Sequence, residues 1–221
     1  MKGYDYMSQK VLRDQTLGEE IANSVSHGVG TLLSIAGAVV AIVMAAIHNT
    51  AIGVVSACLY GASLIMLYSF STLYHSLTNK SAKRVFRVFD HCAIFILILG
   101  SYIPICLTMI GGALGWTLFG INAACTVLGV VFISINLERW KKLSMALYLV
   151  MGWSILFSIK PFLAVVDWSG LPFLVGGGVA YTAGVIFYKA RPKYMHFIWH
   201  IFVIAGSVLQ YFFMLFYVFM K

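Results

Sequence analysis

Two histidines, His196 and His200, lie four residues apart in the run KYMHFIWHIFVIAGSV. A helix turns once every 3.6 residues, so both imidazoles are expected on one helical face, one turn apart. Two neutral imidazoles placed in this way can bind a metal ion. Ionisable side chains within an apolar segment are costly and usually mark a functional site. The alternative is a helix end whose histidines cap the helix or reach the membrane surface.

The composition identifies an integral membrane protein. The 221 residues are 61% hydrophobic and 10% charged, with a mean hydropathy of +0.92, whereas a soluble domain carries about 25% charged residues. Apolar runs of about 20 residues can cross a bilayer. Seven such runs predict an all-α membrane protein, a seven-transmembrane helix bundle; they cover approximately residues 24–47, 52–77, 86–110, 115–136, 143–165, 171–189 and 196–219.

The domain organisation follows from these spans. We expect a flexible cytoplasmic N-terminus over residues 1–15 and a seven-helix transmembrane domain over residues 16–221. The sequence TLGE, from Thr16 to Glu19, is a capping-box pattern. It predicts that a helix begins before the membrane and continues into the first span.

Basic residues predict the orientation, because 13 of the 15 flank alternate ends of the spans. They are Lys2, Lys10, Arg13, Lys80, Lys83, Arg84, Arg87, Arg139, Lys141, Lys142, Lys189, Arg191 and Lys193. The opposite ends carry Lys160 and Lys221. The positive-inside rule therefore predicts a cytoplasmic N-terminus and an external C-terminus. The net charge of +8 then faces anionic lipid of the inner leaflet, and nucleic acid is excluded as the partner.

Further ionisable residues are expected at the depth of the two histidines. His75 ends the second span, Ser71 lies one turn deeper on the same face, and Asp90 lies in the first turns of the third span. His75, His196 and His200 would therefore share one layer near the cytoplasmic surface. Three protein ligands with an open position are typical of catalytic zinc.

The candidate base must come from outside the histidine pair. Phe197 occupies the position where zinc proteases of the H-E-x-x-H type have glutamate, so that class is excluded. Asp90 is the candidate that remains. The alternative for Asp90 is an acidic residue that a helix N-terminus favours electrostatically.

Three motifs follow one another along the chain. EIANSVSH supplies Glu20, Asn23 and His27, STLYH is followed downstream by Asp90, and HFIWH supplies the histidine pair. These three motifs resemble those of the progestin and adipoQ receptor family, and the length and short loops are similar to its bacterial haemolysin III branch. The resemblance runs from about residue 16 to near the end of the chain.

The resemblance implies an intramembrane Zn2+ bound by His75, His196 and His200. Asp90 would hold the zinc-bound water, and Ser71 would lie next to the ligands without binding the metal itself. Glu20, Asn23 and His27 would have a supporting role; the alternative for them is a capping network where the first helix begins. Related ceramidases and adiponectin receptors suggest hydrolysis of a lipid amide, and the bacterial branch implies the bacterial plasma membrane.

Three functions remain open. The first is a zinc-dependent membrane hydrolase that acts on a lipid-like amide or ester and influences membrane lipid homeostasis. The second is a non-enzymatic regulator of the membrane state with structural zinc. The third is a haemolysin or pore, which a channel-like series of polar residues would support. The fourth to sixth spans offer scattered Ser, Thr and Asn instead, and this disfavours a pore.

Overall fold

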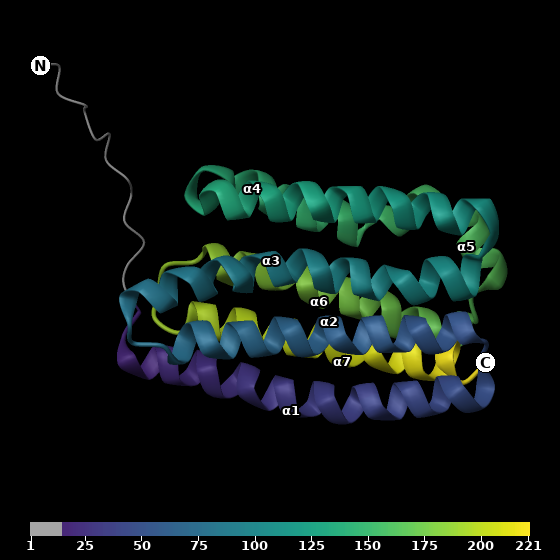
Figure 1. Ribbon diagram of the computed structural model, residues 1–221, viewed down its shortest axis with the longest axis horizontal. Coiled ribbons are helices and arrows are strands. Elements are labelled where there is room, and N and C mark those ends of the chain that lie inside the picture. The colour runs from purple at the N-terminus through teal and green to yellow at the C-terminus, as the bar shows by residue number, and fades with distance from the viewer. Residues whose placement is uncertain (1–14) are drawn as a thin grey trace, which may run out of the picture.

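A computed structural model describes residues 15–221, and this part of the chain is helical throughout (Figure 1). The main helices are α1 (Leu17–His48), α2 (Ala51–Ser76), α3 (Lys80–Pro104), α4 (Gly112–Gly152), α5 (Ile159–Val165), α6 (Leu171–Lys189) and α7 (Met195–Met214). Short π-helical segments follow α3 and α7, over Ile105–Ile110 and Leu215–Phe219, and short 3-10 segments, Ser154–Ser158 and Trp168–Gly170, flank α5. The expectations for residues 1–14, including Lys2, Lys10 and Arg13, lie outside the described residues.

The capping box predicted at the start of the first helix is confirmed. The Thr16 hydroxyl accepts a hydrogen bond from the Glu19 backbone N–H, and Glu19 Oε2 accepts one from the Thr16 backbone N–H at 2.9 Å. These bonds satisfy two backbone donors that a helix start leaves free. Helix α1 therefore begins several residues before its apolar run. Asn23 and His27 lie on the buried face of this helix.

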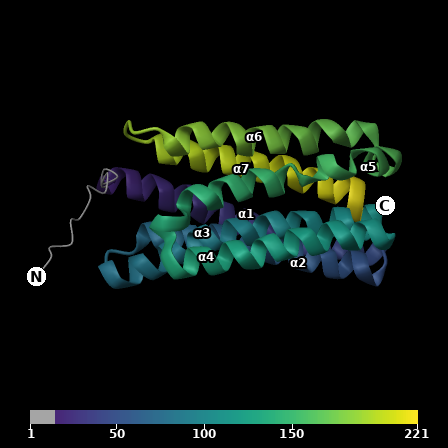
Figure 2. The same ribbon diagram turned by 90° about the horizontal axis from the view of Figure 1, so that it is seen from above.

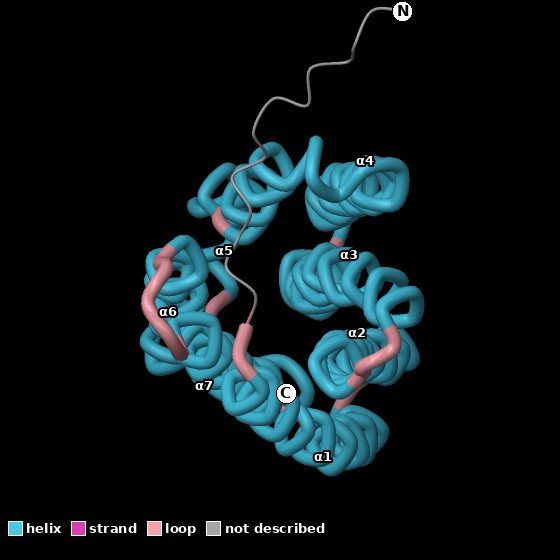
Figure 3. The backbone as a smooth tube through the Cα atoms, turned by 90° about the vertical axis from the view of Figure 1, so that its left-hand side faces the viewer, coloured by secondary structure: helices cyan, strands magenta, loops and turns pink. Residues whose placement is uncertain are grey.

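The helices form a ring in which neighbours follow the chain (Figure 3). Helix α1 packs against α2, α2 against α3, α3 against α4, and α6 against α7, and the ring closes where α7 meets α1. Small residues allow the close approach of α1 and α2. A Cβ atom added at Gly30 would lie 2.6 Å from Cδ1 of Tyr68, so this position requires glycine.

Helix α4 is broken at Asn136, whose φ of −160° and ψ of 95° are not helical. The Asn136 side chain accepts a hydrogen bond from the Arg139 backbone N–H at 3.0 Å, so it caps the helical arm that follows. The chain reverses direction within α4 (Figure 2). The predicted runs 115–136 and 143–165 leave residues 137–142 as a connecting loop, and this prediction is wrong because residues 137–142 are helical and the break precedes them.

Six helical segments among the described residues are long and apolar enough to cross a membrane. Large apolar side chains point outward along them, with Phe157 84% and Ile135 72% exposed. A continuous apolar exterior of this kind requires lipid or another apolar partner. The chain is thus a multi-pass membrane protein, in agreement with the predicted all-α class.

Candidate metal centre

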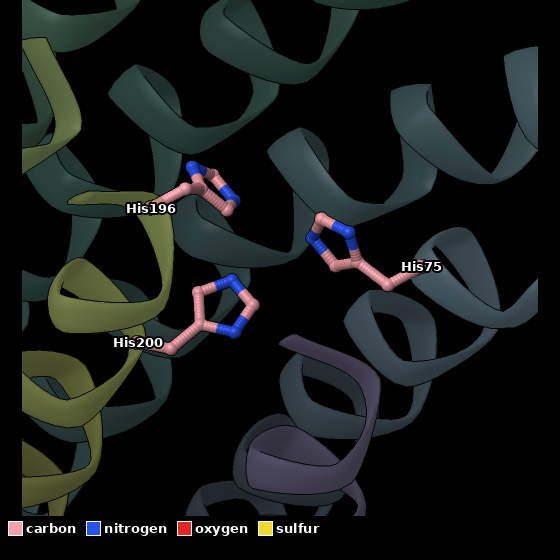
Figure 4. Close-up of side chains that lie close together, drawn as sticks. All are labelled: His75, His196 and His200. Atoms are coloured by element: carbon pink, nitrogen blue, oxygen red, sulfur yellow. The ribbon is translucent and has the colours of Figure 1, made fainter. Parts of the chain in front are cut away.

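Three histidines from two helices meet at one end of the bundle. His75 lies in the last turn of α2, while His196 and His200 lie in the first turns of α7. One ring nitrogen of each lies within 4.8 Å of one ring nitrogen of the other two. Figure 4 shows the rings pointing toward one another. The layer predicted from helical depth is therefore present, and the group can hold a metal ion.

The ring nitrogens of this cluster fit a metal. Nε2 of His75 and Nε2 of His196 are buried and have no hydrogen-bond partner. A buried polar atom without a partner is costly and calls for an explanation such as an ion. Three imidazoles suit zinc, and they suit copper, iron and nickel as well, so the donor set does not select one metal.

A carboxylate of α1 contacts the ring nitrogen Nδ1 of His75. Its Nδ1 lies 2.7 Å from Oε2 of Glu20, in the first turn of α1. The other oxygen of Glu20, Oε1, accepts a hydrogen bond from Lys83 Nζ at 2.8 Å. The first motif of the sequence thus contacts the candidate metal ligands directly. The sequence analysis did not predict this contact of Lys83 with Glu20, because it treated Lys83 only as a positive charge at the membrane surface.

His200 is held by α1 as well. Its Nδ1 lies 3.3 Å from the backbone oxygen of Asn23 and 3.3 Å from the hydroxyl of Ser26. The His27 ring stacks on it, with 3.6 Å between ring centroids. If Nδ1 donates to the Asn23 carbonyl, Nε2 of His200 is the atom available to a metal. Sequence reasoning did not identify Ser26.

Buried polar atoms without partners gather beside the cluster. They include Oδ1 of Asn23, both ring nitrogens of His27 and the hydroxyl oxygen of Ser71, which lies one turn from His75 on α2. The amide nitrogen of Asn23 donates to Gln15 Oε1 at 2.6 Å. The concentration of such atoms indicates a place where water or a polar ligand group can bind.

Asp90 lies on α3, and its carboxylate is not among the ligand atoms that come within 4.8 Å of one another. Its side chain is 14% exposed, and Oδ2 lies 3.8 Å from Nδ1 of the neighbouring His91. His91 itself contacts the backbone oxygen of Arg87 at 2.8 Å. Among the described residues, the grouped ligand atoms therefore come from His75, His196 and His200, and the predicted Asp90 is not one of them.

Comparisons with known proteins support the predicted resemblance. Residues 15–211 match the family described as Haemolysin-III related. Hemolysin-3 of Bacillus cereus is 40% identical over 214 residues, covering 96% of this chain and 98% of that protein. The Hemolysin-3 homolog of Bacillus subtilis (strain 168) is 42% identical over 204 residues, covering 91% and 95%. The human Monocyte to macrophage differentiation factor is 27% identical over 172 residues, covering 72% and 68%.

Proposed function

The chain belongs to the Haemolysin-III related family, and from this premise we propose that it is a zinc-dependent hydrolase of the cell membrane. Its substrate would be a lipid-like amide or ester that reaches the site from the bilayer. The observation that carries the proposal is the buried group of His75, His196 and His200, in which two Nε2 atoms have no partner.

We further propose seven membrane crossings. The segment Gly112–Val165 has 54 residues, which as one straight helix would be about 80 Å long, against a hydrocarbon core of about 30 Å. The break at Asn136 supports two antiparallel crossings in its place. Ten of the twelve Lys and Arg residues among residues 15–221 lie toward one end of the helices: Lys80, Lys83, Arg84 and Arg87 in the first turns of α3, Arg139, Lys141 and Lys142 just after the break in α4, and Lys189, Arg191 and Lys193 around the α6–α7 connection. The positive-inside rule would therefore make the histidine end cytoplasmic and the C-terminus external.

The residues of the site would divide the chemistry between them. A bound zinc ion supplies a Lewis acid and makes water more acidic. Asp90 would accept a proton from the attacking water and return it to the leaving group. Ser71, with a buried hydroxyl that lacks a partner, would hydrogen-bond a polar group of the substrate or the water.

A pore is a poorer account of the same residues. The buried histidine and carboxylate side chains among residues 15–221 are Glu19, His27, His75 and His200, all at one end of the bundle. A conducting path requires polar side chains at every depth. The name Hemolysin-3 belongs to the relative, and nothing in the arrangement of these helices requires pore formation here.

Substitution of Asp90 tests the hydrolase against a regulator with structural zinc. Asp90→Asn keeps the size of the side chain and removes the proton acceptor. Zinc content and folding should stay near wild type, while turnover of a ceramide or another acyl lipid should fall by about 10²-fold or more. Mass spectrometry of products from a broad lipid panel gives the readout. If the wild-type protein turns over no lipid and Asp90→Asn still complements the native phenotype, the regulator becomes the better account.

A further inference from the structure

Glu20 joins three helices at the histidine end of the bundle. It lies on α1, its Oε2 contacts Nδ1 of His75 on α2 at 2.7 Å, and its Oε1 contacts Nζ of Lys83 on α3 at 2.8 Å. The Glu20 side chain is 19% exposed and that of His75 is 1% exposed. Each carboxylate oxygen therefore has one cationic or ring-nitrogen partner, and the contact to His75 is shielded from solvent.

This arrangement determines which nitrogen of His75 faces the cluster. A carboxylate paired with an ammonium group accepts hydrogen bonds and donates none, so Nδ1 of His75 must carry the proton. Nε2 is then left with a lone pair, and it is this atom that is buried without a partner. A metal-binding histidine commonly donates its second ring N–H to a carboxylate, which fixes the tautomer and the ring orientation.

The neighbouring Glu19 caps the start of α1 and contacts the residue before α7. Oε2 of Glu19 accepts from Thr16, and its Oε1 accepts from the backbone N–H of Tyr194 at 2.9 Å. Tyr194 precedes α7 in a left-handed conformation with a φ of 63°. Glu19 thus caps α1 and contacts the start of α7, whereas Glu20 contacts the candidate ligand His75.

We propose that Glu20 is the positioning residue of the metal centre: it holds His75 with Nε2 directed at His196 and His200, and Lys83 holds Glu20 in place. The inference rests on the metal site of the proposed function and adds a requirement to it. Three ligands would not be sufficient for full affinity, because the first turn of α1 must also present its carboxylate to α2.

The test measures zinc binding by the purified full-length protein in detergent, by competition with a chromogenic chelator. Glu20→Ala should weaken zinc binding by about 10- to 100-fold, the usual effect of losing such a partner. Glu138→Ala is the matched control, since Glu138 is paired with Arg87 at 2.6 Å outside the histidine group, and it should leave zinc binding unchanged. Nitrogen-15 histidine spectra of the zinc-loaded protein should show a strongly hydrogen-bonded Nδ1–H on His75 that Glu20→Ala removes.

A rescue variant separates positioning from general stability. In Glu20→Gln the amide oxygen can accept from His75, but the amide nitrogen then faces the ammonium of Lys83. Combining Glu20→Gln with Lys83→Met removes that donor-to-donor contact, so the double variant should bind zinc at least about tenfold more tightly than Glu20→Ala. If Glu20→Ala does not fold, the double variant decides the question alone, and zinc binding as weak as that of His75→Ala overturns the inference.

The outcomes distinguish the two proposals. Wild-type zinc affinity in a folded Glu20→Ala protein, with zinc lost in His75→Ala, would overturn the positioning role and leave the metal centre standing. A wild-type protein that binds no zinc would overturn both the metal centre and the role of Glu20.

Discussion

Replacing His200 by alanine should remove most of the metal while leaving the fold intact. The His200 side chain is 1% exposed, stacks on His27 and lies 3.3 Å from the backbone oxygen of Asn23. Alanine favours the helix as strongly as any residue, so α7 should persist. The Asn23 carbonyl remains near the first turns of α1, where water can replace the lost donor.

The size of the loss can be worked from the ligand count. Structural zinc sites bind with about 10–16 kcal/mol. With four ligands in a complete site, one ligand accounts for about 2.5–4 kcal/mol, which corresponds to about 60- to 700-fold in affinity. The wild-type protein should carry about one zinc per chain. After dialysis against a weak chelator, elemental analysis of His200→Ala should show little zinc.

Two variants control this experiment. His48 is exposed in the last turn of α1, at the end of that helix remote from Glu20, so His48→Ala should keep wild-type zinc. His27→Ala should also keep most of it, because His27 is not among the three grouped ligands. Equal zinc in His200→Ala and His48→Ala would place the metal elsewhere. A loss in His27→Ala as large as that in His200→Ala would mean that the ligand set is different.

Two further predictions concern the fold. A reporter fused after Lys221 should be external and one at Met1 cytoplasmic, because an odd number of crossings separates the ends; both reporters on one side would contradict seven spans. Gly129→Ala should lower the free energy of unfolding by about 1–3 kcal/mol, since a Cβ atom there would lie 2.1 Å from Cζ of the buried Phe95. Gly120→Ala on the same helix should be neutral or stabilising in thermal melts, because nothing lies within 4 Å of its added Cβ.

The helices were predictable because hydropathy and charge are local properties of the sequence. The break at Asn136 falls where the fourth apolar run was predicted to end. The start of the next helix was not predictable in this way, because the charged run after Asn136 reads as a loop. Glu138, Arg139 and Lys141 are good helix formers, and the Asn136 side chain caps the arm that contains them. The charged run therefore marks the neighbourhood of the break, while the capping residue determines where the next helical arm begins.

The histidine group was predictable for a related reason. His75 ends one apolar span and His196 begins another, so counting turns places both at one depth without knowledge of the packing. The role of Glu20 required more, since its partners His75 and Lys83 are 55 and 63 residues away along the chain. The capping pattern predicted a local role for this stretch, and Glu19 does fill that role.

The adjacent residues Glu19 and Glu20 contact different partners because successive side chains of a helix point about 100° apart. Glu19 is directed at Thr16 and Tyr194, and Glu20 at the gap between α2 and α3. The capping pattern predicts one local role for the first turn of α1, so it does not distinguish Glu19 from Glu20. The packing of α1 against α2, where Gly30 lies close to the Tyr68 ring, gives Glu20 its partner His75. If Glu20 positions His75 as proposed, the close packing of α1 on α2 is itself a condition for the proposed metal centre.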